Sequence, residues 1–269
     1  MTKKEKGELL HLAESAALLA GVSLKNKRDE WRNLKTASGR DVKISADLES
    51  ESIIIESLAG SNIPIFSEET GSITAKKGRK TSSDTNLLWI IDPLDGSLNY
   101  HQGVPLSCVS IALYKGLKPV FGVVFDFNQG ELFSGLIGSG AWLNHRPIKT
   151  SHVNELSKAV LGSGFPVNTD FSSSALSRFI GEIQQFRKVR LFGSAALSLC
   201  YVACGRIDAY REENIMFWDV AAGLALVQSA GGTVKVENFG HMGSPVNVMA
   251  ANGLLKIDGM GNSKRKRLS

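Results

Sequence analysis

The sequence predicts a layered α/β protein. In the second half of the chain, short apolar runs that favour strands alternate with longer segments of helical periodicity. The first half adds two helical segments and a series of strand-like runs separated by turns. With 269 residues, 43% of them hydrophobic and 21% charged, the chain can bury a sizeable core and has the composition of an ordinary globular protein.

The first half is expected to start with helices and to continue as a sheet. Small and apolar side chains recur at helical spacing in the first segment, and Ser45 is a suitable N-cap for the second helix. The expected elements, in order, are a helix at 7–22, a polar loop at 25–40, a helix at 45–58, a strand at 63–66, a polar loop at 70–86, strands at 87–92, 107–114, 119–125 and 132–137, and a hairpin turn at 138–140.

The second half is expected to alternate between strands and helices. Residues 218–229 are almost wholly apolar, as in a buried helix, and Gly231 and Gly232 end it. We therefore expect an N-terminal unit (1–149), a C-terminal α/β unit (150–262) and a basic tail (263–269). The expected elements are strands at 159–163, 189–192, 207–210, 233–237 and 246–252 and helices at 172–185, 195–203 and 218–229.

Charge and composition favour a cytoplasmic protein with no membrane segment. The sequence has a pI of about 9.1, but the first seven residues carry +2 and the last seven carry +4, so the body is close to neutral. Such basic ends are usually solvated tails, and a polyanion-binding tail is the alternative. The three cysteines lack the spacing of a zinc site and fit buried thiols in a reducing compartment.

The most informative stretch is Asp92-Pro93-Leu94-Asp95-Gly96-Ser97. An apolar strand at 87–91 leads into two carboxylates, and Pro93 and Gly96 allow the chain to turn so that both acids approach one point. Ser97 is a good cap for a short helix, whose free N–H groups could hold an anion. Two acids beside an anion site indicate a hard divalent cation that brings phosphate and carboxylates together.

This stretch resembles the first signature of the inositol monophosphatase family of magnesium-dependent, lithium-sensitive phosphatases. Trp218-Asp219, followed by Gly231-Gly232, resembles the second signature, and Ser67-Glu68-Glu69 resembles an upstream acidic pair. The resemblance implies a five-layer αβαβα sandwich, Mg²⁺ as cofactor, a small phosphorylated polyol as substrate and a homodimer. Inositol 1-phosphate is the leading substrate.

The resemblance also implies roles for individual residues. The expected metal ligands are Glu68, Asp92, the Leu94 carbonyl, the Ser97 hydroxyl, Asp95 and Asp219, with Glu69 helping a weaker third ion. Asp47 and Ser97 are expected to relay the proton of an attacking water, with Glu68 counted among the catalytic residues. The expected substrate-binding residues are Asp95, Gly96, Ser97, Gly193, Ser194, Ala195, Glu212 and Asp219.

Several alternatives stay open from the sequence. The family usually has Thr at the position of Ser97, and Lys35 is only a loose match to a family loop lysine. Relatives that hydrolyse 3′-phosphoadenosine 5′-phosphate, fructose 1,6-bisphosphate or histidinol phosphate share the same carboxylates. A bacterial relative acts as an RNA-polymerase accessory factor, so a binding role on the same fold is the alternative outside enzyme chemistry.

Overall fold

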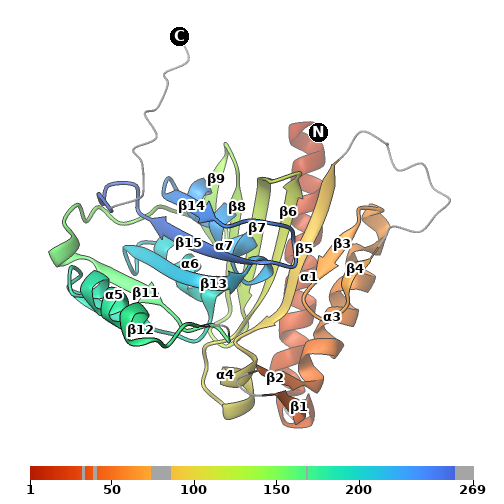
Figure 1. Cartoon of the computed structure of the whole chain (residues 1–269). Helices are drawn as coiled ribbons and strands as arrows, with labels where there is room; N and C mark the ends of the chain where they lie inside the picture. Colours follow the sequence, from red (N-terminus) through yellow and green to blue (C-terminus); the bar gives the residue numbers. More distant parts are fainter. Residues whose placement is uncertain (32–33, 39–40, 74–85, 168, 258–269) are drawn as a thin grey trace.

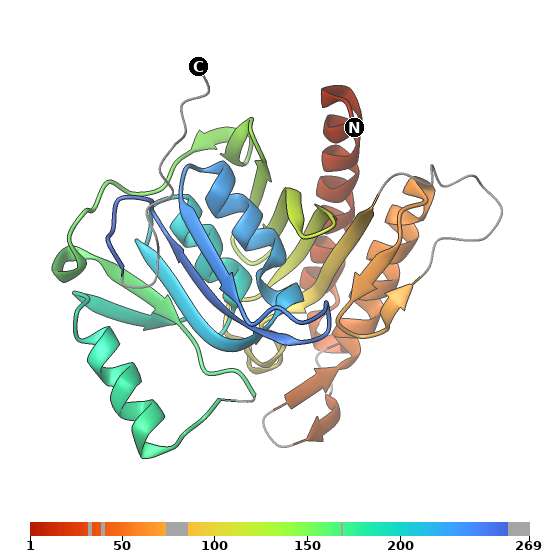
Figure 2. The same cartoon turned by 45° about the horizontal axis from the view of Figure 1, so that its top comes forward.

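Five layers of secondary structure follow one another across the molecule (Figure 1). This computed structural model describes residues 1–31, 34–38, 41–73, 86–167 and 169–257. Helices α1 (Lys3–Asn26) and α3 (Ser45–Leu58) cover one face of an eight-stranded sheet. Helices α6 (Ala195–Ala203) and α7 (Phe217–Ser229) lie between this sheet and a five-stranded one, and α5 (Ser173–Ile183) covers the outer face of the latter (Figure 2). The layered αβαβα sandwich expected from the sequence is confirmed.

The first sheet has the order β10-β9-β8-β7-β6-β5-β3-β4, and among its described strands only β3 and β5 pair in parallel. The second sheet has the order β12-β11-β13-β15-β14, and its β12, β11 and β13 strands are parallel. The strands are β3 (Ile65–Ser67), β4 (Gly71–Ile73), β5 (Leu87–Asp95), β6 (Cys108–Lys115), β7 (Lys118–Asp126), β8 (Glu131–Leu136), β9 (Gly140–Leu143), β10 (Arg146–Ile148), β11 (Val160–Ser163), β12 (Lys188–Leu191), β13 (Ala209–Met216), β14 (Thr233–Glu237) and β15 (Pro245–Ala251).

Helix α1 packs through small side chains. Ala13, Ala16, Ala17 and Ala20 are fully buried against α3 and the first sheet, so the expected apolar stripe is confirmed. The helix starts with a capping box between Thr2 and Glu5. Within the described part of the chain it is the single helix long and apolar enough to span a membrane, a test that buried core helices also pass.

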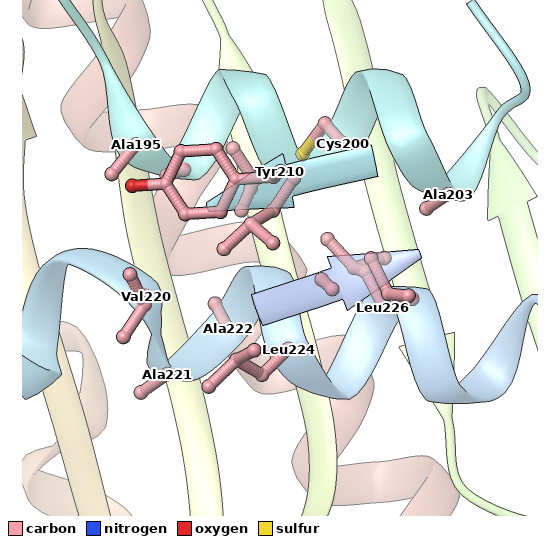
Figure 3. Close-up of a cluster of buried hydrophobic side chains, with 14 of the residues drawn as sticks. Ala195, Cys200, Ala203, Tyr210, Val220, Ala221, Ala222, Leu224 and Leu226 are labelled. Atoms are coloured by element: carbon pink, nitrogen blue, oxygen red, sulfur yellow. The ribbon is translucent and has the colours of Figure 1, made fainter. Parts of the chain in front are cut away.

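Helix α7 is the central element of the core. A Cβ atom at Gly122 of β7 would lie 2.2 Å from the Ala222 carbonyl oxygen, so a residue without a side chain lets α7 approach the first sheet. On its other side, Gly223 makes the same kind of close contact with Leu199 of α6. Figure 3 shows the α6 and α7 side chains that meet between the two helices, with Tyr210 of β13 beside them. This close packing fixes the start of α7, where Asp219 lies.

Three expectations about local structure were wrong. The loop expected at 25–40 contains α2 (Arg28–Trp31) and β1 (Leu34–Ser38), which pairs with β2 (Asp41–Ile44) as an antiparallel hairpin. Part of the loop expected at 70–86 is β4, and β13 extends six residues beyond the expected strand to Met216. These segments are polar or charged, and neighbouring strands, not their own hydrophobic pattern, determine their conformation.

Candidate active site

A β-bulge places two acids of β5 on one face of the sheet. Asp92 pairs with Ser110 and Asp95 pairs with Cys108, so three steps along β5 match two steps along β6. Residues two apart on a strand point to the same side, and the extra residue therefore gives Asp92 and Asp95 a common face. That face is covered by α6 and α7, because Cys108 belongs to the core cluster that they form. The sequence predicted that the chain would leave the strand at Pro93, whereas β5 continues to Asp95.

Three carboxylates from three separate segments meet at this face. Glu68 follows β3, Asp92 lies on β5 and Asp219 lies in the first turn of α7, and one oxygen of each lies within 4.8 Å of the others. The rings of Phe66 and Trp218 are 6.0 Å apart, so the residues just before Glu68 and Asp219 also pack together. Of the expected metal-binding side chains, the structure therefore brings these three into one cluster.

The carboxylate cluster is electrostatically unfavourable when no cation is bound. Burial is the main cause that raises the pKa of Asp92 well above its ordinary value, and the Glu68, Asp95 and Asp219 carboxylates raise it further. The pKa of Asp219 is raised by burial and then by Glu68, Asp95 and Glu212. The charged groups that act most strongly on both residues are thus other acids. A set of oxygen donors with this excess of negative charge fits a hard divalent cation.

Asp95 lies beside the cluster and is held by the N-terminus of α6. Its Oδ2 accepts hydrogen bonds from the Ser194 hydroxyl at 2.5 Å and from the Ala196 N–H at 2.7 Å. Burial raises the pKa of Asp95 to about 6, although these donors oppose the shift. The Gly193-Ser194-Ala195 loop, expected to bind substrate, thus also holds an acid of the opposite half of the molecule.

Asp47 and Ser97 are in direct contact, as expected for a proton relay. The Ser97 hydroxyl lies 2.7 Å from Asp47 Oδ1 and 2.9 Å from the Leu94 carbonyl oxygen, so it can donate to either. Asp47 is only 3% exposed and lies in the first turn of α3. Gly96 precedes the short helix α4 (Ser97–Gln102) with a φ of 86°, and a Cβ atom there would lie 2.7 Å from the Leu106 carbonyl oxygen. The expected turn and short helix are confirmed, but Ser97 is not the cap: the N-cap is Gly96, and the Ser97 hydroxyl contacts Asp47 and the Leu94 carbonyl oxygen instead.

Glu212 lies on β13 and is almost completely buried. Its Oε2 accepts a hydrogen bond of 2.6 Å from the Tyr210 hydroxyl, and burial raises its pKa to about 7. A Cβ atom at Gly164 would lie 2.6 Å from the same oxygen, so glycine makes room for the carboxylate. The Asp95 and Asp219 carboxylates both interact electrostatically with Glu212, which places it next to the acidic cluster.

Sequence reasoning missed residues that orient the site. The Asn99 side-chain amide donates to the Leu106 and Phe192 carbonyl oxygens and so joins α4 to the loop before α6. The Cys108 thiol lies 3.8 Å from Asp95 Oδ2. For the Asn99 contacts, the only signal in the sequence was an Asn two residues after Ser97. The Cys108–Asp95 contact depends on the register of β5 and β6, which the sequence does not show. The Lys35 side chain lies outside the described part of the structure, and Glu69 is not in the three-carboxylate cluster.

Comparisons with known proteins agree with this geometry. A model of the inositol monophosphatase family matches residues 5–256. The chain belongs to the inositol monophosphatase family. It is 34% identical to an inositol-1-monophosphatase of Mesorhizobium japonicum over 236 residues, which is 87% of each chain. It is also 36% identical to the Nus factor SuhB of Pasteurella multocida over 238 residues, covering 87% of this chain and 86% of the relative.

Solved structures of family members superpose on most of the chain. The extragenic suppressor protein SuhB of Bartonella henselae matches with a TM-score of 0.80 and 30% identity, over 92% of this chain and 95% of its own. An inositol monophosphatase from Anabaena matches with a TM-score of 0.75 and 35% identity, over 92% of each chain. The family is a family of phosphatases that are generally metal-dependent, and the acidic cluster is consistent with this.

Proposed function

We propose that this protein is a Mg²⁺-dependent phosphatase of small phosphate monoesters, with inositol 1-phosphate as the leading substrate. The observation that carries the proposal is the convergence of Glu68, Asp92 and Asp219 within 4.8 Å, with Asp92 buried and the other two partly buried. Acids in such a position repel one another and repel phosphate. A phosphate ester can therefore bind there only when a cation neutralises their charge. Relatives named inositol-1-monophosphatase support the substrate.

The donor set supports magnesium as the metal. Glu68, Asp92 and Asp219 supply hard carboxylate oxygens, which Mg²⁺ prefers, and the Leu94 carbonyl and Ser97 hydroxyl lie along the same turn. We assign Asp95 to the same metal centre through its other oxygen, Oδ1, because Oδ2 accepts the hydrogen bonds from Ser194 and Ala196. Bound Mg²⁺ neutralises the acids and polarises the phosphoryl group.

The protein's own residues supply proton transfer and substrate orientation. Ser97 donates a hydrogen bond to Asp47, so a water beside the phosphoryl group can pass a proton to Ser97 while Ser97 passes one to Asp47. We assign the buried Glu212 carboxylate and the loop at Gly193 and Ser194 to the side of the leaving alcohol. An ionised Glu212 that accepts hydroxyl hydrogen bonds favours a polyol over an alkyl ester, because charge-assisted hydrogen bonds are the stronger kind.

A phosphate-release assay tests this function. The purified protein is incubated with inositol 1-phosphate, fructose 1,6-bisphosphate, histidinol phosphate and adenosine 3′,5′-bisphosphate, with Mg²⁺ or with excess EDTA. We expect inositol 1-phosphate to give the highest kcat/KM and EDTA to abolish turnover. Full turnover in EDTA would reject the metal, and a clear preference for the adenosine bisphosphate would replace the inositol assignment with a nucleotidase.

We also propose a homodimer in the cytoplasm. Apolar side chains gather in the exposed region around α5 and β12, where a self-complementary contact would cover them; they are Val167, Phe171, Leu176, Ile180 and Leu191. The three cysteines are free, which suits a reducing compartment. Analytical ultracentrifugation tests the dimer, and a monomer at micromolar concentration would contradict it.

A transcription-related binding role is the second candidate. The observation that favours it is the similarity to a relative named Nus factor SuhB. The basic tail at 263–269, which could contact a polyanion, lies outside the described residues. Electrophoretic mobility shifts with RNA, compared between the full chain and a chain ending at residue 262, test this role. Equal RNA binding by the full and the shortened chain would show that the tail does not contribute to this role.

A further inference from the structure

Glu51 is a buried acid that the proposed mechanism does not use. It lies on α3 and is 3% exposed. Its Oε1 accepts two hydrogen bonds from Thr70, one from the backbone N–H at 3.1 Å and one from the hydroxyl at 3.0 Å. A buried carboxylate is costly for the fold unless hydrogen bonds satisfy it, so a helix that only had to pack would carry an apolar side chain at this position.

Thr70 is the last residue of the tight turn that carries Glu68. Residues 68–70 join β3 to the short strand β4, and Ser67 pairs with Gly71 directly beside the turn. Glu68 lies two residues before Thr70, so hydrogen bonds that fix the Thr70 backbone limit how far Glu68 can move. In Figure 1 and Figure 2, α3 lies beside β3 and β4, and Glu51 thus gives the turn an anchor outside its own sheet.

The same face of α3 contacts two other segments of the site. Asp47, Ser50 and Glu51 are all buried, and their spacing of three and four residues places them on one side of the helix. The Ser50 hydroxyl donates a hydrogen bond of 2.7 Å to the Pro93 carbonyl oxygen, and Asp47 Oδ1 accepts one from Ser97. One helix therefore contacts the turn after β3, the end of β5 and the start of α4, three segments that carry expected metal ligands.

We propose that Glu51 is a positioning residue of the metal centre, which fixes Thr70 and so holds Glu68 close enough to Asp92 for both acids to share one cation. The proposal rests on the metal-dependent function proposed above. In metal sites generally, removing a residue that orients a ligand weakens metal affinity by about 10- to 100-fold. Loss of the Thr70 anchor should therefore weaken metal binding more than it slows the reaction once the metal is bound.

Three substitutions separate the effect of position from the effects of charge and stability. Glu51→Met has a similar length and cannot accept either hydrogen bond, whereas Glu51→Gln also lacks the charge but keeps an oxygen that can accept both. Leu58→Ala is the control for loss of stability, because Leu58 is fully buried near the other end of the same helix. Mn²⁺ is the probe, since it prefers the same oxygen ligands as Mg²⁺, and the electron paramagnetic resonance signal of the free ion gives its affinity without turnover.

We expect Glu51→Met to weaken Mn²⁺ binding about tenfold or more and Glu51→Gln to weaken it by no more than about threefold. In phosphate release from inositol 1-phosphate, Glu51→Met should raise the Mg²⁺ concentration that gives half-maximal rate by a similar factor and lower kcat at saturating Mg²⁺ much less. Leu58→Ala should lower the melting temperature and leave the Mn²⁺ affinity within about twofold of wild type. If Glu51→Met does not fold, Thr70→Val replaces it; this variant loses the hydroxyl that donates to Glu51 and should weaken Mn²⁺ binding by about threefold or more.

Three results would overturn the proposal and leave the metal-dependent function in place. The first is an unchanged Mn²⁺ affinity in Glu51→Met or in its replacement. The second is an equal loss of affinity in Glu51→Gln, which would assign the effect to charge. The third is a loss as large in Leu58→Ala, since a general loosening of α3 would then explain it. If the wild type binds no Mn²⁺ and releases no phosphate, the metal-dependent function itself fails, and the role of Glu51 fails with it.

Discussion

Replacing Glu212 with Gln should stabilise the metal-free protein at alkaline pH. Glu212 is 8% exposed, and its Oε2 accepts a hydrogen bond from Tyr210. The amide oxygen of Gln can accept the same hydrogen bond and has almost the same volume. The substitution therefore removes the buried charge and little else.

The magnitude follows from the pKa of Glu212. Burial raises it from 4.5 to about 7, a difference of about 2.5 units, and each unit corresponds to about 1.4 kcal/mol. Because the folded state binds the proton more tightly than the unfolded state, stability is complete below about pH 4.5 and decreases as the pH rises towards 7. Above pH 7, ionised Glu212 lowers the free energy of unfolding of the wild type by about 3 kcal/mol. Glu212→Gln has no such charge and keeps this stability.

The assay is thermal unfolding in EDTA from pH 5 to pH 8. We expect the melting temperatures of wild type and Glu212→Gln to be similar at pH 5 and to differ by on the order of 5 to 10 °C at pH 8, with the variant higher. Glu213→Gln is the matched control, because Glu213 is partly exposed and pairs with Arg211. The difference in melting temperature between Glu213→Gln and wild type should not increase with pH. A difference between wild type and Glu212→Gln that does not change with pH would refute the reasoning, since Glu212 would then have an ordinary pKa.

Three further predictions concern the acidic cluster and the core. Asp95→Asn and Asp219→Asn should each lower kcat by about a hundredfold or more, because charge stabilisation at the phosphoryl group depends on these acids; rates near wild type would exclude that residue as a ligand. Mg²⁺ at about 100 times its Kd should stabilise the protein by about 2.7 kcal/mol in thermal unfolding, and an equal gain in Asp219→Asn would place the ion elsewhere. Gly223→Ala should lower the free energy of unfolding by about 1 to 3 kcal/mol in urea titration, because its Cβ would lie 2.4 Å from Leu199 Cβ; an unchanged midpoint would show that α6 and α7 can separate.

The sequence predicted most of the helices and strands because their patterns are local. Helix α6 begins and ends at the expected residues, and α7 begins one residue earlier than expected, since both are apolar segments bounded by cap or turn residues. The hairpin of β1 and β2 and the end of β13 were missed, because polar strands owe their conformation to the strands beside them. The order of strands in the two sheets also depends on contacts distant in sequence, and no local pattern specifies it.

The candidate site was predictable in composition and less so in geometry. The acidic motifs named Glu68, Asp92 and Asp219, which the fold brings together. The β-bulge that turns Asp95 to the same face as Asp92 could not be inferred, because it depends on register with β6. The contacts of Asn99 and Cys108 likewise depend on which loops meet, and their residue types alone carry no comparable signal.

The position of Asp95 links the stability of the fold to its chemistry. Asp95 belongs to a strand of the first sheet, yet the donors that hold its carboxylate come from α6, which packs against the second. Glu68 and Asp92 come from the first sheet, and Asp219 comes from α7 between the two. A cation that binds these acids therefore joins the two halves at the point where like charges would otherwise push them apart. Binding of the metal and packing of the halves should thus reinforce each other, because each removes part of the same electrostatic repulsion.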